Sequence, residues 1–250
     1  AWAYLSDAVF DPGHPLLYVA DFFGRRILRL NLDTGFLEGD FGIPGVPSAL
    51  DLSPDGSRLF VTATSEGEFK GMILELDSAT GEISNRYRFA GEASDVVATG
   101  ARSAAVSADF SVVAIDFGTV PTGVHSVPLS QVAALATSGD RTVVIAGDTG
   151  GNISRLTRDP ATGALNLDSR TTGVSGDPYQ HRPFLVPEGS RFILGDGRLY
   201  DSSFGSGDGI QPLRTLDPGG IQDAVFDLPE RRAVFLSTGA GIRQLHAVTF

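Results

Sequence analysis

The sequence predicts an all-β protein, a six-bladed β-propeller with four antiparallel strands in each blade. A segment near the N-terminus, Asp7–Asp11, returns near the C-terminus as Asp223–Asp227. Weaker copies lie between the two at a spacing of roughly 43 residues, and several strands per 40–50 residues are typical of propeller blades. Apolar and polar residues alternate along each repeat, which indicates strands, and no run of ten or more has a helical period.

The second repeat is the most regular one. Ala49–Leu52 and Arg58–Thr62 are predicted strands, and Ser53–Ser57 between them contains Pro-Asp-Gly, whose preferred dihedral angles favour a tight turn. The fifth repeat has nearly the same pattern in Phe184–Leu194. The same pair of strands is expected in the other repeats at 7–20, 95–106, 132–146 and 223–236.

Each repeat continues with two further strands, joined by a turn rich in glycine and aspartate. We expect these outer pairs at 26–37, 72–89, 111–127, 153–167 and 198–213. The sixth repeat lacks its fourth strand and ends at 242–250. The strand-like run Ala1–Leu5 has no repeat of its own, so we expect it to close the last blade and to remove the open sheet edges. Residues 1–250 would then form a single domain.

Composition narrows the classes of partner. The 250 residues carry a formal charge of −11 and no cysteine, and 42% of them are hydrophobic. A negative surface repels phosphate, so nucleic acid and anionic lipid are disfavoured as partners. The sequence contains no run of eighteen apolar residues, so it predicts no membrane-spanning helix. The absence of cysteine excludes disulfide and thiolate chemistry.

Three motifs resemble those of the bacterial propellers of the YVTN, NHL and lactonase-like kind. They are Ser53–Val61, Leu17–Asp21 and Leu76–Gly81, and the resemblance covers about four of the six repeats. It implies the propeller fold and an extracytoplasmic location: secreted, periplasmic or on the cell surface. Members of this group include sugar lactonases, scaffold modules and surface proteins, so the resemblance does not decide the function.

Aspartates lead several of the predicted inner strands, where they would surround one mouth of the central channel. Asp7, Asp95 and Asp223 are the members of this set. Carboxylates that converge raise one another's pKa unless a cation lies among them, and oxygen ligands suit Ca²⁺. The alternative is that each aspartate caps a turn of the backbone.

The least regular junction between repeats is 173–182. It gathers Asp177, Tyr179, His181 and Arg182, which we expect to bind a ligand at the channel mouth. His181, with Asp177 and Tyr179, would also be the catalytic group of an enzyme, because imidazole can act as a general base. The alternative is a surface loop that happens to be polar.

A second candidate binding element is the turn that contains Phe22, Phe23 and Arg25. Aromatic and arginine side chains are enriched at protein interfaces. The same side chains could instead pack on the neighbouring blade.

These features favour a non-catalytic binding or scaffold propeller that presents its channel-mouth loops to a protein, peptide or glycan, with a possible structural Ca²⁺ on the axis. The alternative is a metal-dependent hydrolase of the lactonase or esterase type. The metal of gluconolactonases is held by a glutamate, asparagines and an aspartate on inner strands. Here Asn31 and Asn166 fall on outer strands and no glutamate leads an inner strand, which argues against that chemistry.

Overall fold

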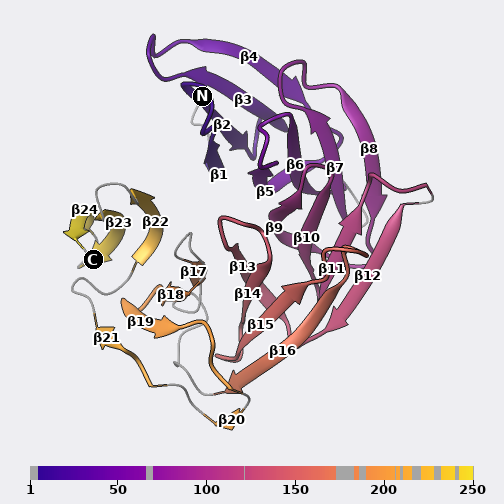
Figure 1. Ribbon diagram of the computed structural model, residues 1–250. Helices are drawn as coiled ribbons and strands as arrows, with labels where there is room; N and C mark the ends of the chain where they lie inside the picture. The colour runs from indigo at the N-terminus through magenta and orange to yellow at the C-terminus, as the bar shows by residue number, and fades with distance from the viewer. Residues whose placement is uncertain are drawn as a thin grey trace. The chain divides into compact units, whose positions relative to one another are not determined.

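The computed structural model consists of strands and turns, and the residues that it describes contain no helix (Figure 1). It describes residues 5–65, 70–120, 122–172, 183–185, 190–205, 207–208, 211–215, 221–227, 232–239 and 242–249. No helix within these ranges is long and apolar enough to cross a membrane. The chain divides into two compact units, one of them running to Pro128 with Ala161–Ala164 added, the other holding the remainder.

The first unit contains three four-stranded antiparallel sheets, each a meander in chain order. Their strands are β1 (Leu5–Phe10), β2 (Leu16–Asp21), β3 (Arg26–Asn31) and β4 (Leu37–Gly42); β5 (Val46–Leu52), β6 (Arg58–Thr64), β7 (Gly71–Asp77) and β8 (Ile83–Arg88); β9 (Ala93–Gly100), β10 (Ser103–Ala108), β11 (Ser111–Asp116) and β12 (Gly123–Pro128). The strand pairs predicted from the alternating pattern are confirmed for all three repeats, including the alanine-rich third one.

The second unit repeats this plan less regularly. One sheet runs β13-β14-β15-β16-β20, a second runs β17-β18-β19-β21, and a third is β22-β23-β24. Their strands are β13 (Val132–Thr137), β14 (Val143–Asp148), β15 (Ile153–Arg158), β16 (Leu165–Thr172), β17 (Pro183–Leu185), β18 (Arg191–Leu194), β19 (Arg198–Asp201), β20 (Gly207–Asp208), β21 (Arg214–Thr215), β22 (Ile221–Asp227), β23 (Arg232–Gly239) and β24 (Ile242–Thr249).

Two details differ from the expected layout of the repeats. Leu5, which we expected in the last blade, lies opposite Asp21 in the first sheet, and Ala1–Tyr4 lie outside the described residues. In the fifth repeat, β20 pairs in parallel with β16 of the preceding sheet, and only β21 pairs with β19. Glycine and serine surround β20 and offer few apolar contacts that would hold it in its own sheet.

The core of the first unit lies between facing sheets. One cluster joins the first sheet to the second and includes Tyr18, Ile27, Leu59 and Leu74; another joins the second to the third. Period-two alternation produces this, because every second side chain of a strand faces the same neighbouring sheet. Tyr18 is 1% exposed, and its hydroxyl donates a hydrogen bond to the carbonyl of Ser78 (3.1 Å). Burial, the largest influence, raises the pKa of Tyr18.

A β-bulge interrupts the inner strand of most sheets. The register shifts once in β1, β5, β13 and β22 where each pairs with the next strand, and β9 has a shift at the corresponding end. In the first unit the bulged residues are Ser6, Ser48 and Ser94. A bulge adds one residue and bends the strand, so it redirects the neighbouring side chains away from the regular pleat.

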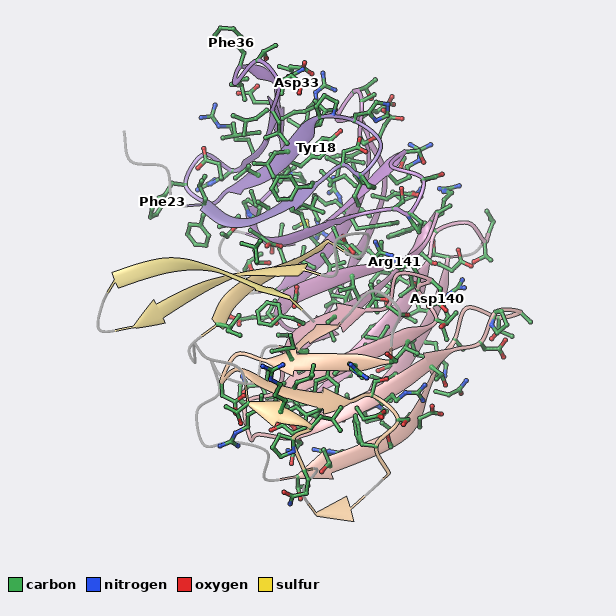
Figure 2. The ribbon with its side chains drawn as sticks, turned by 60° about the vertical axis from the view of Figure 1, so that its left-hand side comes forward. Tyr18, Phe23, Asp33, Phe36, Asp140 and Arg141 are labelled. Atoms are coloured by element: carbon green, nitrogen blue, oxygen red, sulfur yellow. The ribbon has the colours of Figure 1, made fainter. Side chains whose placement is uncertain are left out.

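Two turns in different repeats have the same hydrogen bonds. Asp55 Oδ1 accepts from the hydroxyl of Ser53 (2.6 Å) and from the amide of Ser57 (3.1 Å). Asp140, at the turn labelled in Figure 2, accepts in the same way from Ser138 (2.6 Å) and Thr142 (3.1 Å). These bonds form the turn that was predicted from Ser-Pro-Asp-Gly-Ser.

Candidate functional site

The residues that we expected to form the binding loop are Asp177, Tyr179, His181 and Arg182, and all four lie outside the described residues. Their roles as ligand contacts or, in the enzymatic alternative, as catalytic groups therefore stay predictions. The metal hypothesis is open in part for the same reason. The backbone of Asp223 lies in β22 opposite Leu236, and its side chain is not described.

The other two aspartates of that hypothesis form hydrogen bonds to backbone amides. Asp7 Oδ2 accepts from the N–H of Leu50 on β5, the inner strand of the next sheet (2.9 Å). Asp95 Oδ1 accepts from the N–H of Val96 (2.8 Å). Among the described residues there is no group of three or more His, Cys, Asp or Glu side chains that could hold a metal ion.

The turn between β2 and β3 presents two aromatic rings. Phe23 is 70% exposed and Phe22 36%, and the rings meet edge to face with centroids 5.3 Å apart. Phe23 is labelled in Figure 2 at the tip of this turn. Aromatic pairs in this geometry attract each other, so each ring restrains the orientation of the other. We call residues Phe22–Arg25 the aromatic turn.

Asp21 holds the aromatic turn in place. Its Oδ1 accepts the amide of Gly24 (2.9 Å), and its Oδ2 accepts Nε of Arg26 (3.0 Å), whose Nη1 also reaches Asp40 (2.8 Å). A Cβ atom at position 24 would overlap the Asp21 carboxylate, so a larger residue there would displace the side chain that holds the turn. Arg25 has a φ of 51°, a left-handed conformation that non-glycine residues seldom adopt. Side-chain bonds to Asp21 therefore fix a turn of otherwise unfavourable geometry.

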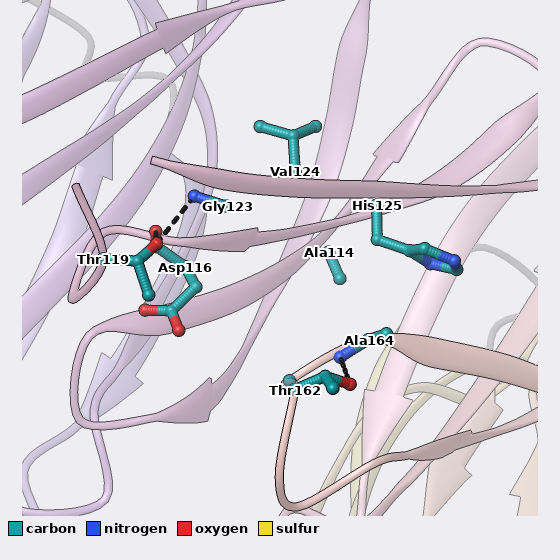
Figure 3. A pocket seen from close by; sticks show the side chains of 9 residues that line it. Ala114, Asp116, Thr119, Gly123, Val124, His125, Thr162 and Ala164 are labelled. Atoms are coloured by element: carbon teal, nitrogen blue, oxygen red, sulfur yellow. Dashed lines mark hydrogen bonds between the residues drawn. The ribbon is translucent and has the colours of Figure 1, made fainter. Parts of the chain in front are cut away.

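A groove that sequence reasoning missed lies beside β12 (Figure 3). Its volume is about 190 Å³, and it is bounded by β11, β12 and the turn Thr162–Ala164, which belongs to the first unit. The lining contains Asp116, Thr119, His125 and Thr162 as its polar members. No local motif could have revealed it, because the two sides of the groove are more than thirty residues apart in sequence.

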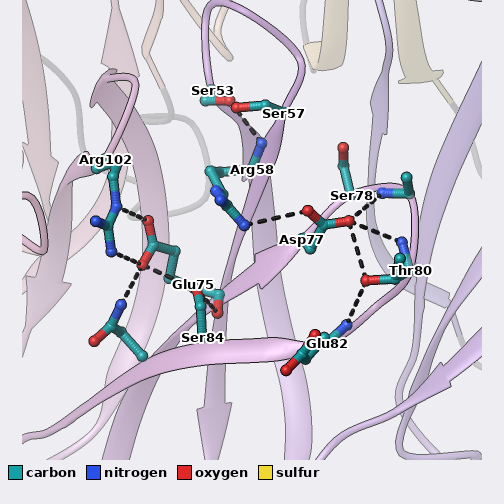
Figure 4. A network of polar contacts seen from close by, with 12 residues as sticks. Ser53, Ser57, Arg58, Glu75, Asp77, Ser78, Thr80, Glu82, Ser84 and Arg102 are labelled. Atoms are coloured by element: carbon teal, nitrogen blue, oxygen red, sulfur yellow. Dashed lines mark hydrogen bonds and ion pairs between the residues drawn. The ribbon is translucent and has the colours of Figure 1, made fainter.

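A buried ionic network lies deeper in the first unit (Figure 4). The Glu75 side chain on β7 is 0% exposed and accepts two hydrogen bonds from Arg102, one to each oxygen, at 2.9 Å. Asn85 Nδ2 (2.6 Å) and Ser84 Oγ (3.1 Å) also donate to it. Glu75 lies between Leu74 and Leu76 in β7, which marks it as unusual, but no local sequence feature identifies Arg102 as its partner.

Comparison with known proteins supports a β-propeller fold and identifies no protein family. No protein-family model matches the chain, and no curated protein matches it. A solved structure that does match is the β-propeller domain of Cps50 (Swd1) from Myceliophteria thermophila. The TM-score is 0.70 over 95% of this chain and 80% of that domain, at 13% sequence identity. At that identity the likeness shows the fold alone: the chain is a β-propeller, all-β and built of repeated antiparallel sheets.

Proposed function

We propose that this β-propeller is a non-catalytic module that binds a partner protein through its aromatic turn. The observation that carries the proposal is the exposure of Phe23, 70%, on a turn whose backbone is fixed by Asp21. Phenylalanine is usually buried, and an exposed aromatic group with arginine beside it is typical of the centre of a protein interface. The similarity of this chain to a solved β-propeller domain is consistent with a scaffold role.

Rigidity is the second argument for the aromatic turn. A partner that orders a mobile loop loses part of its binding free energy to conformational entropy. Here the bonds from Gly24 and Arg26 to Asp21 hold the turn before any partner arrives. Both rings can therefore be buried at little entropic cost.

The proposal includes the wider architecture that the sequence predicts, namely a closed ring of six blades completed by the N-terminal strand. In the described part of the chain the strands fall into six sheets, and the sheet β22-β23-β24 has three strands where each sheet of the first unit has four. An added strand from the N-terminal residues would supply the fourth. Cysteine pairs introduced in residues 2–4 and in β24 would test this, since an intramolecular disulfide should form if the two strands are neighbours.

Channel-mouth contacts from Asp177, Tyr179, His181 and Arg182, and a Ca²⁺ ion near Asp7, Asp95 and Asp223, belong to the same proposal. The support is the chemistry of these side chains: an acidic residue, a base and an aromatic ring together suit a polar ligand, and carboxylates suit Ca²⁺. A peptide segment of the partner is the ligand that fits a protein-binding role best.

The test uses a photoreactive phenylalanine analogue at position 23. We expect it to crosslink one partner, which is then purified, and Phe23→Ala should weaken its binding by about tenfold or more. The control is Phe36, which is 74% exposed on the turn between β3 and β4 of the same sheet (Figure 2). The photoreactive analogue at position 36 should capture no partner, and Phe36→Ala should not change binding. Equal crosslinking at both positions would contradict the proposal.

A further inference from the structure

We propose that β12 is a docking edge that takes up an extended peptide strand with a lysine or arginine side chain, and that this side chain reaches Asp116. Among the described sheets, β12 is the last strand on its side of the sheet β12-β11-β10-β9. The outer groups of a terminal strand can hydrogen-bond to a strand from another protein. This surface is separate from the aromatic turn, so either proposal can fail without the other.

β4 and β8 occupy the same terminal position as β12 in the other two sheets of the first unit. β4 contains Glu38 and Asp40, and β8 contains Arg86 and Arg88. Each of these two strands also pairs with a register shift. Charges, prolines and bulges are devices that keep a terminal strand from pairing with another chain.

β12 has neither a charged residue nor a bulge, and its one proline, Pro128, is its last residue. Its sequence is Gly-Val-His-Ser-Val-Pro, without Lys, Arg, Asp or Glu. Its six residues pair with β11 in unbroken register, from Ser111 opposite Pro128 to Asp116 opposite Gly123. Val124, His125 and Ser126 are exposed. A regular, uncharged, exposed strand is the geometry that accepts another strand.

The groove lies beside this strand on one face of the sheet. His125 and Val124 lie on opposite faces of β12, and His125 shares its face with Ala114, its partner across the sheet (Figure 3). Asp116 lies two residues beyond Ala114, hence on the same face. Its partner on β12 is Gly123, so β12 itself places no side chain between Asp116 and the open side of the strand. The hydroxyl of Thr119 lies beside Gly123 and accepts its amide (2.9 Å).

Because β12 does not cover Asp116, a strand bound at this edge can reach it with a positively charged side chain. Two strand spacings, about 9.5 Å, separate β11 from a strand added beyond β12, a span that the lengths of a lysine or arginine and an aspartate side chain cover together. The nine residues that line the groove include Asp116 and no lysine or arginine. Asp116 Oδ1 accepts the amide of Gly118 (2.7 Å), and among the described residues no ion pair includes Asp116. Arg102 is near enough to feel its charge, but two of its nitrogens bond to Glu75.

A second copy of this chain fits the edge less well. It would bring another formal charge of −11 to an edge that already has a carboxylate, and like charges oppose association. A basic peptide instead gains from the net charge of the protein at long range and from Asp116 on contact.

The test is a titration of the isotopically labelled chain followed by NMR. The probe is a capped heptapeptide of alternating threonine and valine with lysine at its centre, and matched probes carry glutamine or glutamate there. We expect saturable shifts of the amide signals of Val124–Val127 and of Gly163 and Ala164. The lysine probe should bind about threefold to fivefold more tightly than the glutamine probe, and the glutamate probe more weakly than both.

Two controls separate strand addition from other binding. Only every second amide of an added strand faces β12. N-methylation of the amides that face β12 should therefore abolish binding of the probe, and N-methylation of the other amides should leave it intact. Asp116→Asn keeps an oxygen for Gly118 and should remove the preference for lysine over glutamine, whereas Asp40→Asn on β4 and Phe23→Ser should leave it. No saturable shift at β12, equal binding of the three probes, or dimers through β12 without peptide would each overturn the proposal.

Discussion

Glu75 and Arg102 join two sheets of the first unit through a pair of hydrogen bonds of 2.9 Å each, with the carboxylate 0% exposed and the guanidinium 43% exposed. Glu75 lies on β7 of the second sheet, and Arg102 lies in the turn between β9 and β10 of the third. The arginine thus supplies the positive charge for a carboxylate whose other side-chain donors, Asn85 and Ser84, are neutral. Its removal should be far more costly than the loss of an exposed ion pair.

We expect Arg102→Met to lower the free energy of unfolding by about 2–3 kcal/mol, since a buried carboxylate loses two charged donors. Urea denaturation measures it. Arg58→Met is the matched control. The side chains of Arg58 and Asp77 are 30% and 35% exposed, so the loss of unfolding free energy should stay below about 1 kcal/mol. Equal losses would show that Glu75 is not effectively buried.

The double variant Glu75→Gln with Arg102→Met tests the same pair by a thermodynamic cycle. Glutamine is neutral, so it requires no cation, and it can still accept from Asn85 or Ser84. The double variant should therefore be more stable than Arg102→Met alone. A simple sum of the two single losses would mean that the residues do not interact.

Stability should fall in acid, and Glu75 should contribute to the fall. Burial raises the pKa of Glu75, but hydrogen bonds from Arg102, Asn85 and Ser84 outweigh it, and the net pKa lies below the ordinary 4.5. A carboxyl with a depressed folded pKa contributes stability above its unfolded pKa, and this contribution is lost as the pH falls through the folded value. Glu75→Gln should flatten the dependence of unfolding free energy on pH below about 4.5. An unchanged slope would contradict this assignment.

The repeated turns give a matched pair of backbone substitutions. Gly56 has a φ of 72° in the first, and Arg141 has 61° in the second. Gly56→Ala places a Cβ in the left-handed region and should cost about 1 kcal/mol. Arg141→Gly relieves the same strain and should cost less than an ordinary replacement by glycine, or stabilise by a few tenths of a kcal/mol. Thermal unfolding of both variants checks the pair, and a stabilising Gly56→Ala would contradict it.

Substitutions at Asp7 distinguish two roles for its carboxylate, which are to accept the amide of Leu50 and to bind a metal ion. Asp7→Ala leaves the amide of Leu50 without its acceptor and should cost about 1–2 kcal/mol. Asp7→Asn retains an acceptor oxygen, so it should cost less. If Ca²⁺ binds near Asp7, calcium should raise the midpoint of thermal unfolding of the wild type, and Asp7→Asn should reduce that shift. No shift with calcium or with EDTA would refute the cation.

The regular part of this fold could be predicted because its signals are local. Ser53–Ser57 contains the serine, aspartate and glycine that form the turn, and the flanking strands show which residues face the core. The Glu75–Arg102 pair and the groove beside β12 depend instead on which repeat lies against which. That information is shared between distant segments of the chain, and a period of two residues does not contain it. Likewise, glycines and serines around β20 do not specify which sheet it joins.

The bulged inner strands have a consequence for how a protein built of repeated sheets can change in evolution. The hydroxyl of Ser6 donates to the carbonyl of Pro47 (3.1 Å), and that of Ser48 donates to Ala93 (3.0 Å), at the same place in two successive sheets. β5 thus carries the donor for the inner strand after it, β9, and the acceptor for the inner strand before it, β1. A gene duplication that copies one whole sheet copies both halves of the link. The number of sheets can therefore grow by tandem duplication without any new complementary pair of residues having to arise.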